Sequence, residues 1–414
     1  MTETGAHTLV IHDAAELVVG PATESDATLE VREDAALVAA DGAVVAVGES
    51  EAITRKYPPE NADVAIDASG QAVVPGFVDP HTHAVFAGDR SDEFEARLRG
   101  KRYQEILEEG GGILRTVRAT RDASADRLLE RLLAHLETML THGTTTAEVK
   151  SGYGLETETE LELLEVIDRA DAAQPVDCVA TFMGAHAVPE EREADDYVDA
   201  VVDDQLPAVA DQGIAAFCDV FCEEGVFDVA QSRRVLEAGR RVGLEPKVHA
   251  EEFTRLGGAE LAAELGATSA DHLLYATDED VDALAAAGTV PVFLPGTAFA
   301  LDEAYADARA FLEAGAPVAL ATDFNPNCHV RSMGFVQTLA CLEMGLAPAE
   351  ALLGATHDAA LAIGREDGTG TLREGAPADA LVLEAPSSVH VAYRFDTSAV
   401  ETVLKGGEVV RRRG

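Results

Sequence analysis

The sequence has no tryptophan, very little lysine and few basic residues of any kind. Lys and Arg number 31 against 75 Asp and Glu, which leaves a formal net charge of −44 at pH 7. Bulk electrostatics therefore excludes nucleic acid and anionic membrane surfaces as expected partners. The acidic residues are spread along the chain, a balance that resembles halophilic proteins of salt-saturated cytoplasms, where salt screens surface repulsion.

Long apolar runs and a secretion signal are also lacking. No stretch approaches the roughly 20 apolar residues that a membrane span needs. The first residues, MTETGAHTLVIHD, are acidic, whereas a signal peptide begins with a basic segment and continues with an apolar one. The five cysteines are odd in number and irregularly spaced, which argues against a disulfide framework. We therefore expect a cytoplasmic protein.

The chain of 414 residues exceeds the length at which a single core usually stops growing, so a large domain and a smaller one are expected. Residues 8–74 contain short strand-like segments separated by Gly-containing turns. Residues 369–413 show the same pattern. These segments predict a small β-sandwich domain formed from both chain termini, residues 1–75 and 366–414.

The middle of the chain, residues 76–365, alternates short apolar segments with amphipathic ones. The expected strands are 76–79, 144–149, 176–183, 214–221, 244–249, 267–274, 289–294 and 317–322. The spacing of apolar residues predicts helices, most of which end at a glycine. They are 126–143, 158–173, 229–243, 256–266 and 278–288. Eight such strands predict a (β/α)8 TIM-type barrel, whose functional residues lie at the carboxyl ends of the strands. A doubly wound sheet has the same alternation, but its Gly-rich fingerprint after the first strand is missing.

Two histidines, His81 and His83, follow the first expected strand in the segment PGFVDPHTH. Residues i and i+2 of an extended chain point to the same side, so the two rings can share one cation. Alone, this pair is a weak signal. Three further potential ligands stand at strand ends, namely His249 after the fifth, His272 after the sixth and Asp323 after the eighth. Four strand ends therefore present His or Asp at the face where such barrels carry out chemistry.

This set of donors predicts a metal site. Two or three imidazole nitrogens with one carboxylate suit Zn²⁺ or Fe²⁺ and leave room for water. A bound divalent cation lowers the pKa of that water toward neutrality and polarises a carbonyl. Asp323 could then both contact the metal and carry the proton of the water.

The entry segment VPGFVDPHTH and this ligand pattern resemble the amidohydrolase superfamily. Longer motifs narrow the resemblance to the imidazolonepropionases over most of the chain: HAVFAGDRSDEFEARLRGKRYQEI, GGGILRTVRATRDAS, EVKSGYGL, TFMGAHAVPEE, DVFCEEGVF, KVHAEEF, SADHLL and TDFNPN. The resemblance implies that a metal-activated water opens the cyclic amide of 4-imidazolone-5-propanoate, giving N-formimino-L-glutamate in histidine degradation.

The resemblance also implies roles for individual residues. The metal, Zn²⁺ or iron (Fe²⁺/Fe³⁺), would be held by His81, His83, His249 and Asp323. Glu252 would contact a ring nitrogen and assist proton transfer, while His272 would position the water or polarise the attacked carbonyl. Binuclear relatives commonly use a modified lysine at the end of strand four, where this chain reads VFCEEG, so a single metal ion is expected.

A substrate with a propanoate tail needs a cation near the mouth of the site. Arg90, on the loop after the first strand, is the expected partner. Without the resemblance, a surface ion pair with Asp89 or Asp92 would be the preferred interpretation. Tyr153 and His186, after strands two and three, would complete the pocket.

The loop after Asp323 departs from the family pattern. The family reads Asn-Pro-Gly followed by Ser or Thr, whereas this chain reads Asn325, Pro326, Asn327 and Cys328. Asn can adopt the left-handed conformation that Gly permits, whereas a thiol is a weaker hydrogen-bond partner than a hydroxyl. The resemblance places Asn325, Asn327 and Cys328 at the substrate.

Two other functions stay open from the sequence. A purine or pyrimidine deaminase of the same superfamily would use a similar metal but has less use for Arg90. A catalytically silent barrel that binds only a small anion or a partner protein would not need the full set of ligands. The resemblance further implies a small-molecule substrate and a homodimer.

Overall fold

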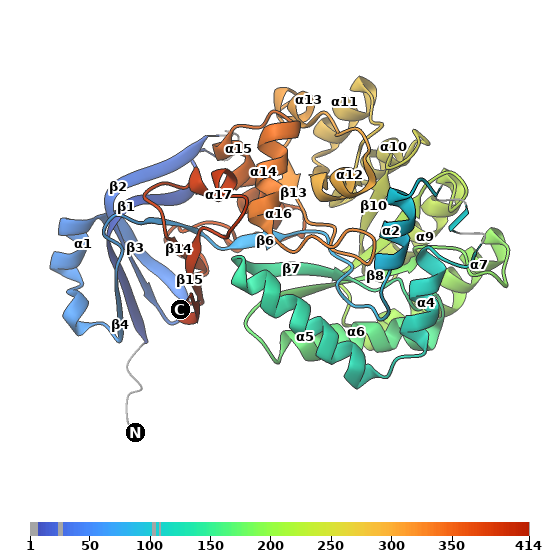
Figure 1. Ribbon diagram of the computed structural model, residues 1–414, viewed down its shortest axis with the longest axis horizontal. Helices are drawn as coiled ribbons and strands as arrows, with labels where there is room; N and C mark the ends of the chain where they lie inside the picture. The colour runs from blue at the N-terminus through green and yellow to red at the C-terminus, as the bar shows by residue number, and fades with distance from the viewer. Residues whose placement is uncertain (1–6, 24–27, 102–104, 107–108, 414) are drawn as a thin grey trace.

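The computed structural model describes residues 7–413 except 24–27, 102–104 and 107–108. Two parts lie side by side: a small β domain that holds both chain ends, and a larger barrel surrounded by helices (Figure 1). Across the described ranges, no helix combines the length and the apolar character needed to cross a bilayer.

The small β domain is built from both ends of the chain, as predicted. Its eight strands form one sheet in the order β16-β15-β14-β5-β1-β2-β3, with β4 beside β1. They are β1 Thr8–Pro21, β2 Leu29–Ala40, β3 Ala43–Glu49, β4 Val64–Asp67, β5 Ala72–Pro75, β14 Ala380–Leu383, β15 Val400–Lys405 and β16 Glu408–Arg412. The antiparallel pairing of β5 with β14 joins the N-terminal and C-terminal segments. Two short helices, α1 Ser50–Lys56 and η1 Pro59–Asn61, follow β3.

The barrel contains all eight predicted strands, paired in parallel in sequence order from β6 to β13. They are β6 Phe77–Asp79, β7 Thr144–Lys150, β8 Asp177–Ala185, β9 Phe217–Cys222, β10 Glu245–Ala250, β11 Ser269–His272, β12 Val290–Phe293 and β13 Ala319–Leu320. The first and last strands meet just beyond their ends, where the Asp323 amide donates to the His81 carbonyl and the His83 amide donates to the Phe324 carbonyl. This closure brings the residues that follow β6 and β13 together.

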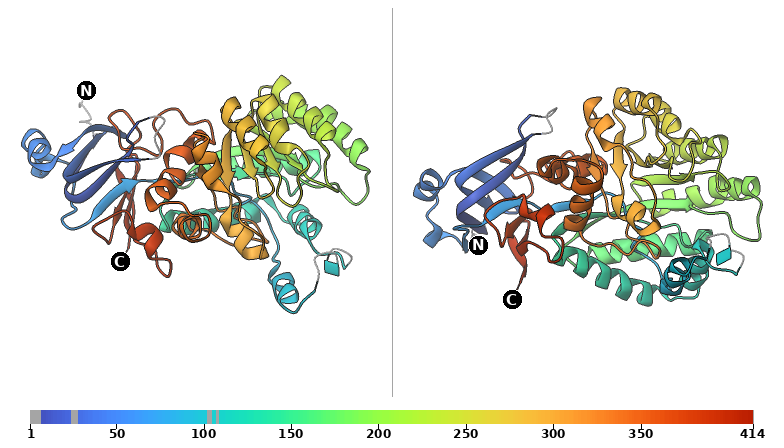
Figure 2. Two further views of the ribbon diagram at one scale, coloured as in Figure 1. Left: turned by 90° about the horizontal axis from the view of Figure 1, so that it is seen from above. Right: turned by 45° about the horizontal axis from the view of Figure 1, so that its top comes forward.

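The helices pack around the barrel (Figure 2). The five predicted helices are present as α5 Ala125–Thr141, α6 Thr157–Asp171, α9 Val229–Arg241, α10 Gly258–Leu265 and α11 Asp278–Ala287. The side chains of Ser124 and Asp228 accept hydrogen bonds from backbone amides at the starts of α5 and α9, which fixes where these helices begin. The remaining helices are α2 Ser91–Leu98, α4 Ile113–Arg121, α7 Ala194–Ala200, the π-helical turn η2 Val201–Gln205, α8 Leu206–Gln212, α12 Pro295–Leu301, α13 Ala308–Glu313, α14 Met333–Glu343, α15 Pro348–Gly354, α16 His357–Leu361 and α17 His390–Tyr393.

An ion pair and a close backbone approach connect the two parts. Lys405 of β15 contacts Asp177 of β8 at 2.8 Å and Asp379 at 2.6 Å. Gly76, between β5 and β6, lies so close to Thr145 that a Cβ atom there would be 2.3 Å from the Thr145 hydroxyl. The backbone passes from the sheet into the barrel at this point, so the position has room only for glycine.

Candidate metal centre and active site

The residues that were predicted to bind a metal lie at the carboxyl end of the barrel. His81 and His83 follow β6, His249 lies in β10, and Asp323 follows β13. All four are buried. Asp323 has φ 48°, a left-handed conformation that side chains rarely adopt. Such strained residues persist where the surrounding structure fixes them, often at functional sites.

The spacing of the nitrogens fits one tetrahedral ion. The Nε2 atoms of His81 and His83 are 3.3 Å apart, and those of His83 and His249 are also 3.3 Å apart. Nitrogens bound at about 2.05 Å to a tetrahedral ion are separated by about 3.3 Å. Asp323 Oδ1 lies 3.6 Å from His81 Nε2 and 3.7 Å from His83 Nε2, in reach of the same ion.

Two buried carboxylates orient the histidine rings. His81 Nδ1 lies 2.6 Å from Asp271 Oδ2, and His249 Nδ1 lies 3.1 Å from Asp219 Oδ1. Because a carboxylate accepts the proton on Nδ1, the Nε2 atom keeps its lone pair for a cation. Burial lowers the pKa of His81 well below its usual range, so its ring is neutral, as metal binding requires.

Asp323 is held by neighbouring donors. The Thr297 hydroxyl donates to Asp323 Oδ2 at 2.5 Å, and the Asn325 side-chain amide donates to the Asp323 carbonyl at 2.8 Å. Burial raises the pKa of the Asp323 carboxyl. A carboxylate so destabilised in the absence of a cation is suited to bind one.

Glu252 and His272 lie beside this cluster. His272 Nε2 is 3.7 Å from Glu252 Oε2, and both side chains are buried. Burial, with the charges of Asp323 and Glu223, raises the pKa of Glu252 well above its usual range. Burial lowers the pKa of His272 well below its usual range. The pair therefore combines a carboxyl group that holds its proton more tightly than usual with an imidazole that holds one less tightly, a combination suited to proton transfer.

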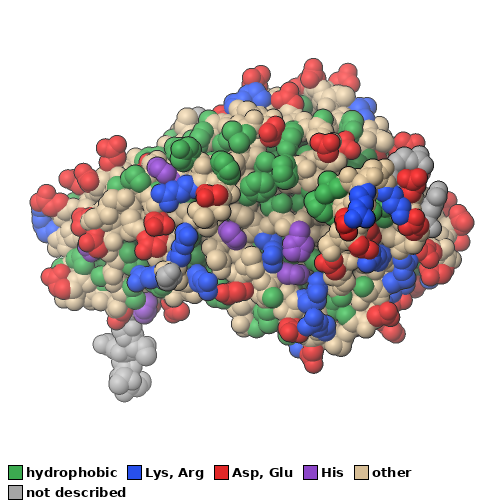
Figure 3. All heavy atoms as spheres, in the orientation of Figure 1, with side chains coloured by type: hydrophobic (Ala, Val, Ile, Leu, Met, Phe, Trp, Pro, Cys, Tyr) green, Lys and Arg blue, Asp and Glu red, His purple; other side chains and the backbone are tan. Residues whose placement is uncertain are grey.

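A cavity of about 550 Å³ opens above the cluster. Its size is that of a small-molecule site. The predicted site residues that line it are His83, Arg90, Tyr153, His186, His249, Glu252, His272, Asp323, Asn325 and Asn327. In the space-filling view, histidine side chains reach the surface in the middle of the face that carries the barrel (Figure 3).

Arg90 provides the positive charge of the cavity and is itself buried. Its Nε donates to Glu93 Oε2 at 2.8 Å, so the ion pair involves neither Asp89 nor Asp92. Glu93 also accepts from the Gly112 amide at 3.0 Å, with Gly112 at φ 75°. Within the described part of the chain, no hydrogen bond engages the two Nη atoms of Arg90. The guanidinium therefore has two donors left for a ligand.

His186 and Tyr153 form one wall of the cavity. His186 Nδ1 lies 2.9 Å from the Gly152 carbonyl, to which it donates, and its ring stacks on His83 with the centroids 4.7 Å apart. Gly152 has φ +96°, and a Cβ atom there would lie 2.8 Å from His186 Nδ1. Glycine at this position thus permits the placement of His186.

The loop after Asp323 is a turn held by one side chain. Asn325 Oδ1 accepts from the amides of Asn327 at 2.7 Å and Cys328 at 3.0 Å. Asn327 is not among the residues with positive φ, so the expected left-handed conformation is not needed there. The Cys328 thiol is buried, points to the Thr322 carbonyl at 3.7 Å and does not line the cavity. Asn325 and Asn327 therefore face the cavity, whereas Cys328 packs behind it.

Several residues of the site were not predicted. The orienting carboxylates Asp219 and Asp271 and the Asp323 partner Thr297 belong to this group. The signal for the two carboxylates was a charged residue inside an otherwise apolar strand, which burial makes costly unless it has a partner. Nothing in the local sequence marks Thr297.

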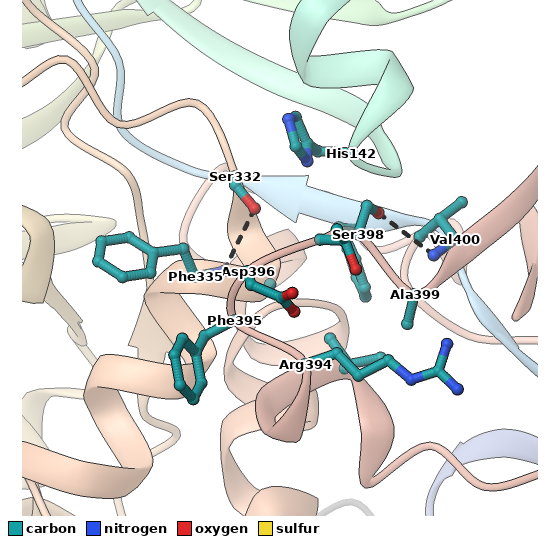
Figure 4. A pocket seen from close by; sticks show the side chains of 13 residues that line it. His142, Ser332, Phe335, Arg394, Phe395, Asp396, Ser398, Ala399 and Val400 are labelled. Carbon is teal, nitrogen blue, oxygen red and sulfur yellow. Dashed lines mark hydrogen bonds between the residues drawn. The ribbon is translucent and has the colours of Figure 1, made fainter. Parts of the chain in front are cut away.

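A second, smaller cavity of about 120 Å³ lies between the barrel and the C-terminal segment. Figure 4 shows that Arg394, Asp396, Ser332 and His142 surround it. Ser332 and Ser398 accept hydrogen bonds from the backbone amides of Phe335 and Val400, so both hydroxyls serve local turns. The predicted metal ligands lie outside this cavity.

Comparisons with known proteins agree with this geometry. Residues 72–410 match the amidohydrolase family. The imidazolonepropionase of Haloarcula marismortui is 67% identical over 97% of this chain and 95% of its own length. The imidazolonepropionase of Geobacillus kaustophilus is 47% identical over 98% of this chain and 96% of its own length. An adenosine deaminase from Xanthomonas campestris with bound zinc has a similar fold, with a TM-score of 0.74 and 18% sequence identity. The match covers 97% of this chain and 92% of the deaminase chain. The chain therefore belongs to the imidazolonepropionases of the amidohydrolase family.

Proposed function

We propose that the chain hydrolyses 4-imidazolone-5-propanoate to N-formimino-L-glutamate through the residues gathered at this cavity. One observation carries the assignment of the site: His83, His249 and Asp323 line one cavity together with Glu252 and Arg90, and His81 lies against these ligands. The relatives at up to 67% identity support the reaction, and they do not favour the deaminase alternative.

His81, His83, His249 and Asp323 would hold one metal ion. Three imidazoles and one carboxylate suit Zn²⁺ or Fe²⁺. The ion would lower the pKa of a water molecule and polarise the ring carbonyl.

The side chains around the metal would move the protons. Asp323 takes a proton from the attacking water as its oxygen bonds to the carbonyl carbon. Glu252 gives a proton to the ring nitrogen as the C–N bond breaks, and His272 donates a hydrogen bond to the developing oxyanion. The net change is addition of one water, with the hydroxyl on carbon and the proton on nitrogen.

The cavity mouth would hold the carboxylate tail. The two free Nη donors of Arg90 match the two oxygens of a carboxylate. Tyr153, His186, Asn325 and Asn327 would contact the rest of the substrate. Cys328 would contribute through its place in the turn, because its thiol packs behind the cavity.

We also propose that the chain forms a homodimer. Phe299 of α12, Leu342 of α14, Tyr393 of α17 and Phe395 are between 58% and 74% exposed. Helices α12 and α17 both pack against α14, and hydrophobic side chains gather on this face in Figure 3. A group of exposed apolar side chains like this one is unusual on a monomer, and more so on a protein with such an acidic surface.

The acidic composition and the halophilic relatives support a place in a salt-rich cytoplasm.

The experiment is to purify the protein without added metal, measure its metal content and follow the ultraviolet band of freshly made 4-imidazolone-5-propanoate. We expect one metal ion per chain and loss of the band. Asp323→Ala should lower kcat/KM at least a thousandfold, whereas Asp126→Ala, which changes a side chain that is 90% exposed, should leave it unaltered.

Two outcomes would contradict the proposal. An unchanged band with metal bound, together with ammonia release from a nucleobase, would identify a deaminase. No turnover of any of these substrates by the metal-loaded protein would favour the silent barrel.

A further inference from the structure

Two of the scarce lysines lie inside the barrel. Lys150 of β7 and Lys247 of β10 have fully buried side chains. The interior of such a barrel is usually filled by branched aliphatic side chains. An ion pair in this position costs desolvation free energy, so its presence calls for a reason other than stability.

Lys150 contacts both carboxylates that orient the metal-binding histidines. Its Nζ lies 2.8 Å from Asp219 Oδ2 and 3.7 Å from Asp271 Oδ2. Asp219 accepts from His249, and Asp271 accepts from His81. One ammonium group is therefore connected to two of the four proposed metal ligands, one after the first strand of the barrel and one in the fifth.

Lys247 completes the same network from the other side. Its Nζ lies 3.1 Å from Glu148 Oε1 and 3.0 Å from the Pro80 carbonyl, the residue before His81. Glu148 Oε2 in turn lies 2.7 Å from Lys150 Nζ. The network thus holds the side chain of His81 through Asp271 and its backbone through Pro80.

The network contains three carboxylates and two ammonium groups in a region without water exposure. Without Lys150, Asp219 would lose the ammonium group that it contacts, and Asp271 would keep only the charge of Lys247. Like charges at low dielectric repel strongly, so both groups would rotate toward other donors. The Nδ1 partners of His249 and His81 would then be displaced together.

We propose that Lys150 is a positioning residue that sets the orientation of His81 and His249 toward the metal. It acts through Asp219 and Asp271 and touches neither substrate nor metal. The inference rests on the proposed function only for the presence of a metal at this cluster. Carboxylates that orient metal-binding histidines typically change metal affinity 10-fold to 100-fold when they are disturbed.

The test compares three variants of the full chain. Lys150→Met removes the charge, Lys150→Arg restores it, and Lys405→Met is the matched control, because Lys405 also joins two carboxylates but lies at the contact between the two parts. Zn²⁺ affinity is measured by equilibrium dialysis against a competing chelator. The visible spectrum of the Co²⁺-loaded protein reports ligand geometry.

We expect Lys150→Met to bind Zn²⁺ roughly 10-fold to 100-fold more weakly and to change the Co²⁺ spectrum. Lys150→Arg should recover most of the affinity, and Lys405→Met should match the parent in both readouts while melting at a lower temperature. If Lys150→Met does not fold, Lys150→Gln takes its place with the same expectation.

An affinity within threefold of the parent, with an unaltered Co²⁺ spectrum, would overturn the positioning role. Equal losses in Lys150→Met and Lys405→Met would also overturn it, because the effect would then be one of general stability. Failure of the proposed function is a separate result: the parent protein would bind metal but leave 4-imidazolone-5-propanoate unchanged.

Discussion

Replacing Arg90 by lysine tests the binding of the substrate tail while the positive charge is kept. In the structure, Arg90 Nε is committed to Glu93 at 2.8 Å, and the Nη atoms are left for the ligand. Lysine has a single nitrogen in place of these three. Glu93 is buried and its Oε2 pairs with residue 90, so losing that partner would be costly, and the lysine ammonium should stay with Glu93.

The size of the effect follows from the donors that are lost. The tail would lose two charge-assisted hydrogen bonds, each worth about 1.5–3 kcal/mol. Water and the remaining positive charge offset part of that loss, which leaves a net of about 2–4 kcal/mol. At about 1.4 kcal/mol per tenfold change, KM should rise roughly thirtyfold to a thousandfold. The value of kcat should change little, because the metal ligands and Glu252 are untouched.

The assay is steady-state loss of the substrate band in molar KCl. Arg99→Lys is the control, because Arg99 lies near the same helix, pairs with Glu95 and is 77% exposed. It should behave as the parent. A KM for Arg90→Lys within threefold of the parent would refute the assignment of the Nη atoms to the tail. A fall in kcat as large as the fall in kcat/KM would refute it too, since the contact would then form only in the transition state.

Two further predictions concern pH and assembly. Burial lowers the pKa of His135 to about 4. Between about pH 6.5 and 4, His135 is therefore protonated in the unfolded chain but neutral in the folded protein, so the free energy of unfolding falls as the pH drops through this range. Between pH 7.5 and 5.0 the parent should lose about 2 kcal/mol more unfolding free energy than His135→Asn, whose amide can still donate to Ala84; equal losses in urea titrations would contradict this. Leu342→Glu should shift the sedimenting species from dimer to monomer, while Leu98→Glu, at a site of similar exposure, should not; a parent that sediments as a monomer would contradict the dimer.

The sequence by itself determined the barrel and the type of chemistry. The eight strands were predictable because strands buried on both faces are short, apolar and separated by helices that end at glycine. The histidines and Asp323 were predictable because each lies at or just after the carboxyl end of a strand, and the carboxyl ends of parallel barrel strands converge on one face. These features are local, so they can be found without knowledge of which strand lies beside which.

The tertiary structure alone decided how those residues are held. The contacts of Lys150 with Asp219 and Asp271 depend on side chains that three strands send into the barrel interior. Arg90 pairs with Glu93 because the loop turns into α2 at that point. Periodicity states which side of a strand a residue occupies, whereas its partner across the barrel is set by strand register and closure. That information is shared between distant segments and exists only once they are packed together.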